Sequence, residues 1–505
     1  MTTTEIDSTT SAPHGFLDSD APHCWPIRAA LPLILFFAAL LAYGFLNRYQ
    51  NWGDDWAQYI IQGKAILSGG VREAVRQNAF MTHESSTPPG PVAYPWGLPL
   101  LLAAEASLFS SSLEVFKLFN ILFFLLLVVS IHRLARKYVN GIEALAVACL
   151  FAFNPVLLHY CNHIVPEIPF TLASVCAFIA MENRRASERS RLLSPFAAGA
   201  LAFAAFTFRS NGILILGAAT VRQFLPSSAR KVWQRPSLAA ILAPYASFFL
   251  LGVLWHFIFP SGGEGYLQML GTATVHTFIT NARTYPITLF DFFTGGHHSA
   301  VAAILLGPVL LWGAFKTWRK TAHLSVYILL TLALYIVWPE GQGYRFMIPL
   351  TPFMVILFML GLDELADWKS VGKFPPILAR AVQFGFPLLF LLASSAVVAT
   401  GRTPQEAWHP YDQPSSEMFQ WIRSNTPGDA VISFFKPRAL HLLTDRLCLT
   451  AWPADVPKAS FFVYTKEFSF WNQGQPPIQD YRNVAALTPV FENRNFIVYR
   501  VAARP

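Results

Sequence analysis

Charged residues are scarce in this chain. Asp, Glu, Lys and Arg make up 13% of its 505 residues, whereas a soluble globular protein carries roughly 25%. Apolar types make up 54% of the chain, and 44 residues are phenylalanine. This composition excludes an ordinary soluble enzyme, a disordered chain, a collagen-like repeat and a coiled coil. We therefore expect a polytopic membrane protein.

Cysteines and nucleotide-binding motifs are equally scarce. No two of the five cysteines form a CxxC pair, so the sequence supports neither a disulfide framework nor a cysteine-based zinc site. No glycine-rich phosphate loop occurs in the segments predicted to be cytoplasmic. The net charge of +8 does not indicate a nucleic-acid partner, because the basic residues fall in the connections between apolar runs.

Eleven apolar runs predict about eleven membrane spans. The first, residues 27–46, is about 20 residues long, enough to cross a hydrocarbon core roughly 30 Å thick. The polar residues before it lack the basic start and short apolar core of a secretory signal. Several runs are shorter than about 17 residues, so we expect short spans or helices broken near one membrane face. The other ten runs lie near 114–132, 142–158, 165–181, 195–208, 211–225, 237–259, 299–315, 324–338, 346–362 and 374–399.

The distribution of basic residues predicts the orientation. Residues 97–109 are not counted as a span, because this stretch is short and contains Glu105, which favours an interfacial helix. With the N-terminus inside, the five short cytoplasmic connections then carry 16 Lys and Arg, as the positive-inside rule requires. Counting 97–109 would reverse every later connection. We expect a protein of the bacterial inner (plasma) membrane with a cytoplasmic N-terminus.

Three parts are predicted along the chain. Residues 1–26 form a polar cytoplasmic tail, and residues 27–400 form the membrane module, whose first outer loop, 47–113, holds juxtamembrane helices. Residues 401–505 change to a mixture of helical and β-rich patterns separated by Pro and Gly turns, which predicts a small extracytoplasmic α/β domain. The fold class is therefore mainly α. The tail has no recognisable catalytic motif, so we do not expect it to be the catalytic part.

An acidic pair just outside the first span is the first candidate site. Asp54 and Asp55 stand in GDDWAQY, where either carboxylate could cap the helix that follows. Adjacent carboxylates at a membrane surface are costly unless they are hydrated, paired or used. One of them could serve as a general base, with its pKa raised by the neighbouring charge. Tyr59 lies on the apolar side of the same helix.

A second acid is predicted on the same membrane face. Glu167 lies at the outer start of a span in HYCNHIVPEIPF, a position where a lone Glu usually serves as a solvated cap. His159 and His163 flank it, and a set of His, Glu and Asp side chains could bind a divalent metal. Their spacing matches no known metal motif. A divalent metal is thus possible, and no cofactor is certain.

Two outer-face arginines complete the candidates. Arg209 and Arg345 could anchor the chain at the lipid headgroups, or hold a phosphate, for which the guanidinium is the best suited side chain. Arg345 is the stronger candidate for the phosphate, because Glu340 and Tyr344 lie beside it. The paired histidines 297 and 298 in the neighbouring outer loop are interpreted as ordinary loop residues.

In their order along the chain, these motifs resemble the GT-C membrane glycosyltransferases. The similarity is to the branch of the protein O-mannosyltransferases and the aminoarabinose transferase for lipid A, and it covers roughly residues 27–500. One departure leaves the equivalent of the family's first acid open, because its usual Tyr stands four residues after that acid, while Tyr59 follows Asp55 by four and Asp54 by five. The motifs are GDDWAQY, YPWGLPLLLA with Tyr94, PEIPFTL, RSNG, GYRFMIPLTP, and in the tail MFQWIRSNTPGDAVI with PRALHLLTDR.

The resemblance implies an inverting hexosyl- or pentosyltransferase. It would move a sugar from a polyprenyl-phosphate donor to an acceptor hydroxyl on a lipid, polysaccharide or protein outside the membrane. Asp54 or Asp55 would be the base, Glu167 would orient the acceptor or a metal, and Arg345 and Arg209 would hold the leaving phosphate. Supporting roles would fall to Tyr59, Tyr94, His163, Glu340 and Tyr344.

Two other functions compete with this interpretation. One is a transporter or flippase of lipid-linked sugars with an outer binding domain, and the other is a membrane sensor or assembly protein. Transporters tend to place charged sites near the middle of the membrane, whereas the acids here cluster at one face. The sensor leaves the aspartates and arginines unexplained. The sequence identifies neither the sugar nor the acceptor, nor the oligomeric state.

Overall fold

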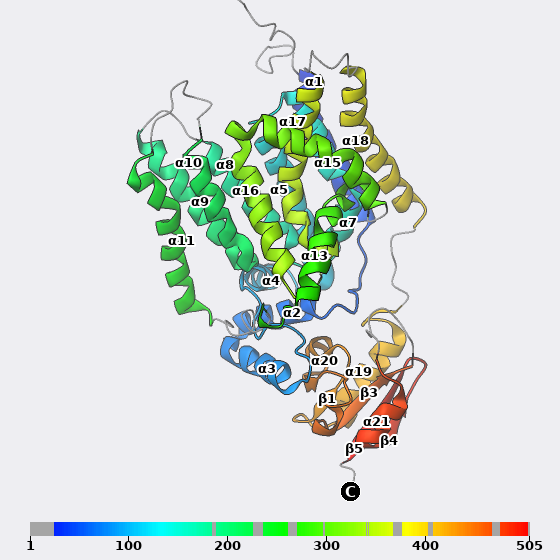
Figure 1. Ribbon diagram of the computed structural model, residues 1–505. Helices are drawn as coiled ribbons and strands as arrows, with labels where there is room; N and C mark the ends of the chain where they lie inside the picture. The colour runs from blue at the N-terminus through cyan, green and yellow to red at the C-terminus, as the bar shows by residue number, and fades with distance from the viewer. Residues whose placement is uncertain are drawn as a thin grey trace, which may run out of the picture.

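The structure, a computed structural model, consists of a helical bundle with a small sheet-containing domain at one end (Figure 1). The predicted residues Glu340 and His297 lie outside the described part, as does most of the polar N-terminal tail. The described residues are 25–183, 188–225, 236–260, 270–295, 298–339, 341, 343–366, 376–401, 408–466 and 475–502.

Each of the eleven apolar runs coincides with helical structure. Eight form single helices: α1 (Trp25–Gly44), α5 (Leu113–Ala135), α8 (Glu167–Glu182), α9 (Glu188–Phe208), α11 (Leu238–Ile258), α15 (Ser299–Lys316), α16 (Trp318–Val337) and α18 (Pro376–Ala399). Three are interrupted: α6 (Gly141–Ala152) with α7 (Pro155–Cys161), η1 (Ser210–Leu214) with α10 (Ile215–Gln223), and η2 (Gly343–Phe346) and η3 (Ile348–Leu350) with α17 (Thr351–Ala366).

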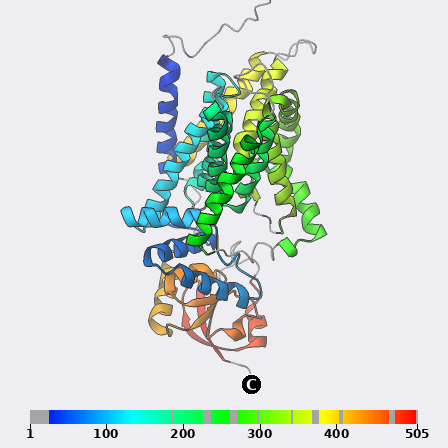
Figure 2. The ribbon, with the colours of Figure 1, turned by 90° about the vertical axis from the view of Figure 1, so that its left-hand side faces the viewer.

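The number of spans stays a prediction. Within the described residues, six helices are long and apolar enough to cross a membrane, or seven if α6 and α7 form one broken span bent by 56°. The break has a local cause, because Asn154 accepts hydrogen bonds from the first backbone N–H groups of α7 and so starts a new helix there. The described apolar parts of α1 and α9 are shorter than the six. Helix α1 begins at the end of the bundle far from the C-terminal domain (Figure 2).

Two glycines let α15 and α17 approach closely. A Cβ atom on Gly313 would lie 2.1 Å from the backbone oxygen of Leu357, and one on Gly361 would lie 2.1 Å from the oxygen of Val309. Small residues at such positions allow van der Waals packing between helix backbones, which is the main force between helices in lipid.

Replacing Gly313 with Ala is therefore expected to destabilise the bundle, because the backbone atoms facing it cannot move aside. Overpacking of this kind costs about 1–3 kcal/mol, which should lower the melting temperature in detergent by several degrees. Gly385→Ala in α18 is the matched control, because no described atom lies within 4 Å of a Cβ built there. Equal melting temperatures for the two variants would contradict the close packing.

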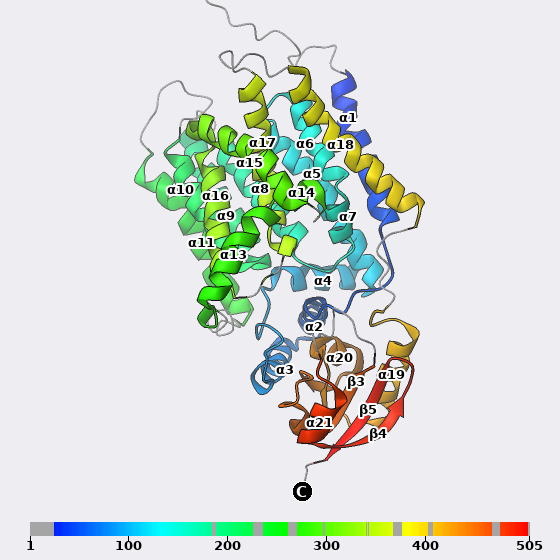
Figure 3. The ribbon, with the colours of Figure 1, turned by 45° about the vertical axis from the view of Figure 1, so that its right-hand side comes forward.

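The first outer loop contains three helices at the end of the bundle near the C-terminal domain: α2 (Asp55–Ser68), α3 (Val71–Glu84), which lies beside that domain, and α4 (Gly97–Leu108) (Figure 1). Figure 3 shows α4 lying across the end of the bundle rather than along it. This helix is the stretch that was left out of the predicted spans. Between α11 and α15 lie α13 (Val275–Thr288) and α14 (Asp291–Thr294), and α13 packs against α16.

The C-terminal domain is a five-stranded mixed sheet with helices. The strand order is β2-β1-β3-β5-β4, with β1 parallel to β2 and β3, and β5 antiparallel to β3 and β4. Trp52 and Met81 of the first outer loop are fully buried in its core, so the domain is joined to the loop by a shared apolar cluster. The strands are β1 (Val431–Ser433), β2 (Leu447–Leu449), β3 (Phe461–Thr465), β4 (Ala486–Glu492) and β5 (Phe496–Ala502), and the helices are α19 (Gln413–Asn425), α20 (Pro437–Thr444), η4 (Val456–Lys458) and α21 (Ile478–Val484).

Candidate active site

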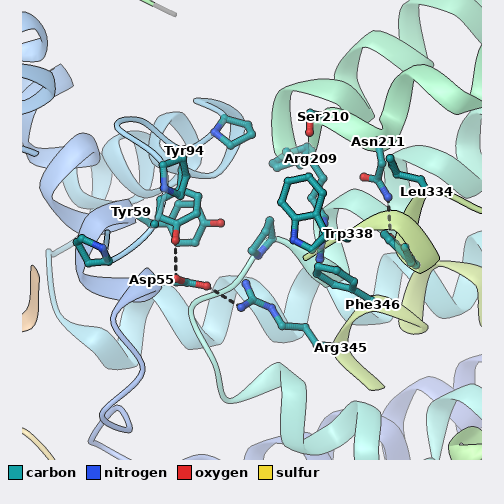
Figure 4. Close-up of a pocket in the computed structure, with 17 residues that line it drawn as sticks. Asp55, Tyr59, Tyr94, Arg209, Ser210, Asn211, Leu334, Trp338, Arg345 and Phe346 are labelled. Atoms are coloured by element: carbon teal, nitrogen blue, oxygen red, sulfur yellow. Dashed lines mark hydrogen bonds and ion pairs between the residues drawn. The ribbon is translucent and has the colours of Figure 1, made fainter. Parts of the chain in front are cut away.

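A pocket of about 840 Å³, which includes the open space at its mouth, lies between the first outer loop and the ends of the membrane helices. Figure 4 shows Asp55, from the first of these parts, in direct contact with Arg345, from the second. Its described lining consists of Asp55, Tyr59, Pro89, Gly90, Pro91, Tyr94, Pro95, Pro166, Phe208, Arg209, Ser210, Asn211, Leu334, Tyr335, Trp338, Arg345 and Phe346.

Two acids and two arginines alternate in this site. Arg345 donates to Asp55 Oδ2 at 2.6 Å and to Glu167 Oε1 (Figure 4 shows the first of these bonds). The same oxygen of Glu167 accepts from Arg209 at 2.6 Å. The sequence therefore predicted four residues that the fold brings into one connected group, although 290 positions separate Asp55 from Arg345.

The ion pairs differ in exposure, and this difference indicates which groups a ligand can reach. The Glu167 side chain is fully buried, whereas 32% of the Asp55 side chain, 19% of Arg345 and 15% of Arg209 are exposed. The Arg209 guanidinium also lies 4.7 Å from the centre of the Phe346 ring. A buried carboxylate that holds two arginines fixes their positions, while both arginines keep a surface on the pocket. Glu167 is thus suited to orient the arginines.

The environment of Asp55 favours its charged form. Tyr94 donates to Asp55 Oδ1 at 2.5 Å, and the ring of Tyr59 lies 4.7 Å from that of Tyr94. Burial opposes ionisation, but Arg345 and the Tyr94 hydroxyl together hold the pKa of Asp55 below its usual range. This differs from the expectation of a raised pKa, because the carboxylate accepts hydrogen bonds from a cation and from a hydroxyl. Asp55 is therefore an ionised carboxylate at neutral pH.

Asp54 faces away from the pocket and toward the C-terminal domain. Its carboxylate accepts from the backbone N–H groups of Arg438 at 3.4 Å and of Ala439 at 3.1 Å, in the first turn of α20. Burial raises the pKa of Asp54, against the opposing effect of the nearby Arg438 and Lys436. Asp54 is the N-cap of α2 and Asp55 is its first residue, and of these two neighbours only Asp55 lines the pocket.

The C-terminal domain contributes a residue that the sequence analysis did not single out. The Arg438 guanidinium is fully buried and donates to the Tyr94 hydroxyl at 3.0 Å, one hydrogen bond from Asp55. The prediction that the tail is not the catalytic part stays a prediction, and the structure adds that the tail contacts the site through Arg438. The available signal was a cationic residue within PRALHLLTDR, a tail motif already noted for the resemblance.

The remaining predicted residues lie outside the connected group. The ring of His163 lies 4.5 Å from that of His159, and its Nδ1 is 2.9 Å from the backbone oxygen of His159. Burial and the nearby His159 lower the pKa of His163 to about 3. The Tyr344 hydroxyl is buried, and neither His163 nor Tyr344 lines the pocket. Glu340 lies outside the described residues, and His298 adopts a left-handed backbone conformation before α15.

The hypothesis of a metal site built from histidines and acids finds no support in the described part of the chain. No group of three or more His, Cys, Asp or Glu side chains in that part is arranged to hold a metal ion. The two acids of the site are paired with arginines instead of histidines.

Comparison with known proteins finds one family model and several solved structures that resemble this chain. The family model described as dolichyl-phosphate-mannose-protein mannosyltransferase matches residues 93–256, which include Tyr94, Glu167 and Arg209. A comparison of the sequence with the curated proteins finds no match.

Three solved structures resemble the chain over most of its length. ArnT from Cupriavidus metallidurans bound to undecaprenyl phosphate has a TM-score of 0.57 and 12% identity, over 93% of this chain and 98% of that one. The oligosaccharyltransferase AglB from Archaeoglobus fulgidus, in complex with an inhibitory peptide and a dolichol-phosphate, has a TM-score of 0.55 and 12% identity, covering 87% and 70%. The arabinofuranosyltransferase AftD from Mycobacteria has a TM-score of 0.52 and 11% identity, covering 94% and 42%. The resemblance seen in the motifs is thereby confirmed, and this integral membrane protein has the fold of the GT-C superfamily of membrane glycosyltransferases.

Proposed function

We propose that the protein is a glycosyltransferase that moves a sugar from a polyprenyl-phosphate donor to an acceptor hydroxyl, with inversion at the anomeric carbon. The observation that carries the proposal is the pocket lined by Asp55, Arg345 and Arg209, in which ionised Asp55 forms an ion pair with Arg345. A base and a cationic phosphate site within one cavity are what displacement of a lipid phosphate requires. The GT-C neighbours whose structures contain polyprenyl phosphates support the choice of donor.

In the proposed reaction, the acceptor oxygen attacks the anomeric carbon while the bond from that carbon to the phosphate oxygen breaks. The acceptor proton passes to Asp55, and the electron pair of the broken bond leaves on the polyprenyl phosphate. Arg345 and Arg209 stabilise the negative charge that develops on this leaving group. A bound phosphate would also compete with Asp55 for Arg345, which would free a carboxylate oxygen for the acceptor.

The same arrangement supports an assignment of the two membrane faces. The pocket and the C-terminal domain lie at the same end of the bundle, whereas α1 starts at the other end (Figure 2). With the predicted cytoplasmic N-terminus, the reaction would take place on the extracytoplasmic side of the bacterial inner membrane. The prenyl chain would remain among apolar helices, close to Phe208, Leu334 and Trp338 in the pocket wall.

The test is a transfer assay in liposomes. Purified protein is incubated with a panel of radiolabelled polyprenyl-phosphate hexoses and pentoses and with candidate lipid, glycan and peptide acceptors. The proposal expects one donor to lose its sugar and an equal amount of polyprenyl phosphate to appear. Specific binding or translocation of a lipid-linked sugar without turnover of any donor would contradict it and favour the transporter.

A further inference from the structure

The C-terminal domain reaches the proposed active site through the side chain of Arg438. This residue lies in the first turn of α20 and is fully buried. Its guanidinium donates to the Tyr94 hydroxyl at 3.0 Å, and its Cζ atom lies 5.1 Å from the centre of the Tyr94 ring. Tyr94 donates in turn to Asp55, so a path of two hydrogen bonds joins the domain to the carboxylate in the pocket.

The direction of these two bonds follows from their chemistry. A guanidinium can only donate, so the Tyr94 oxygen accepts from Arg438. The single hydroxyl proton of Tyr94 is then available for the ionised Asp55, which can only accept. Arg438 therefore fixes the direction in which the Tyr94 hydroxyl points.

The other donors of Arg438 hold the loop that forms one wall of the pocket. They reach the backbone oxygens of Pro89 at 3.0 Å and Pro91 at 2.7 Å, and Asn78 Oδ1 at 3.0 Å. Between the two prolines, Gly90 has a φ of 137°, a conformation that side-chain-bearing residues rarely adopt. A Cβ atom there would lie 2.8 Å from the Arg438 guanidinium. The loop from Pro89 to Pro91 therefore packs directly against the Arg438 side chain.

Other contacts seat the domain independently of the Arg438 side chain. Trp52 is fully buried in the domain's core, and Asp54 accepts from the start of α20. Asp455 of the domain accepts from the backbone and from the hydroxyl of Ser86, both at 2.8 Å. Removing the guanidinium therefore leaves the contacts that hold the domain in place.

We infer that Arg438 is a positioning residue of this enzyme: from the C-terminal domain it holds Tyr94, and Tyr94 orients the Asp55 carboxylate toward the acceptor. The inference rests on the proposed function, in which Asp55 is the base. It makes the C-terminal domain a part of the active site.

The charge of Arg438 affects the pKa of Asp55, so the pH dependence of kcat/KM tests this inference in a way that a purely structural role would not affect. The charged and titratable groups that act on Asp55 are Tyr94, Arg345, Arg438 and Lys436; Tyr59 acts on Arg345, and the neighbouring Asp54 is turned toward α20. Burial opposes ionisation of Asp55, whereas Arg345, Tyr94 and Arg438 lower its pKa. Loss of Arg438 or of the Tyr94 hydroxyl raises that pKa. The acid limb of kcat/KM, which reports the ionised base, then moves to higher pH.

The experiment is a double-mutant cycle on the full-length protein in liposomes, with the donor that the wild type uses. Arg438→Gln and Tyr94→Phe are each expected to lower kcat about 10–100-fold, the effect of losing a hydrogen bond to a charged group. Donor KM should change far less than kcat. The double variant should be no slower than the slower single variant, because both changes break one path. Both single variants should shift the acid limb to higher pH.

Arg446→Gln is the matched control. Arg446 belongs to the same domain and donates to Thr426, Thr444 and Arg423 within it, so its loss should change neither kcat nor the acid limb. An Arg438→Gln variant as active as this control would overturn the inference, as would rate losses that multiply in the double variant with an unmoved acid limb.

Two further variants separate the possible failures. If Arg438→Gln does not fold, Arg438→Lys takes its place, because lysine keeps the charge but not the fork of donors. Arg438→Lys is expected to lose part of kcat. A wild-type kcat for this variant would overturn the inference. Asp55→Asn tests the proposed function itself. Transfer by Asp55→Asn at the wild-type rate would reject Asp55 as the base, whereas an inactive Asp55→Asn beside a fully active Arg438→Gln would reject only the positioning role.

Discussion

Replacing Asp55 with Asn is expected to lower the transfer rate by about 10²–10⁴-fold, the usual contribution of a general base. The amide has nearly the same shape, and its one oxygen can still accept from Arg345 or from Tyr94, but it cannot take the acceptor proton. Donor binding should persist, since Arg345 and Arg209 keep their charges. The measurement combines single-turnover transfer with binding of the polyprenyl-phosphate donor.

Asp54→Asn is the control for this substitution, because Asp54 lies next in the chain but outside the pocket. Asn still offers an oxygen to the first turn of α20 and is as good a helix cap as Asp. Transfer should therefore fall less than tenfold. If Asp54→Asn were inactive and Asp55→Asn active, the assignment of the base would be reversed.

The second large effect is expected from Arg345→Gln. This change removes the cation that contacts both Asp55 and Glu167 and that faces the proposed phosphate. Loss of one donor that stabilises developing negative charge costs about 10²–10³-fold in kcat. Donor affinity should fall as well, since the phosphate of the donor is already anionic. Steady-state kinetics with donor titrations measure both effects.

Two comparisons sharpen this result. Arg345→Lys keeps a point charge but cannot contact Asp55 and Glu167 at once, so it should be intermediate. Arg283→Gln removes an exposed arginine of α13 that does not line the pocket, and it should behave as the wild type. Wild-type kinetics for Arg345→Gln would exclude this residue from the phosphate site.

The sequence predicted the members of the site better than their pairing. The positive-inside rule and the apolar runs predict that Asp55, Glu167, Arg209 and Arg345 lie on one membrane face. Each of them stands where a span meets a connection on the predicted outer side. Which acid meets which arginine depends on how the helices pack, and the pattern of a single chain does not contain that packing. Which of Asp54 and Asp55 lines the pocket depends on the docking of α20, whose first turn donates to Asp54.

The sequence analysis missed Arg438 for a physical reason. Arg438 lies in the tail, and only the docking of Trp52 into the domain's core brings it to Tyr94. A helical pattern and a β-rich run predict elements of an α/β domain but not the surface on which it rests. The number of spans, which stays a prediction, depends on run length, and run length becomes ambiguous where a helix is broken, as at Asn154.

The most direct test of the central claim is a single-turnover reaction followed by NMR, with a donor of known anomeric configuration. The account predicts that the new glycosidic bond has the inverted configuration and that it forms in step with polyprenyl phosphate monoester, one for one. Retention of configuration, or polyprenyl phosphate released without a glycosylated acceptor, would contradict direct displacement assisted by Asp55.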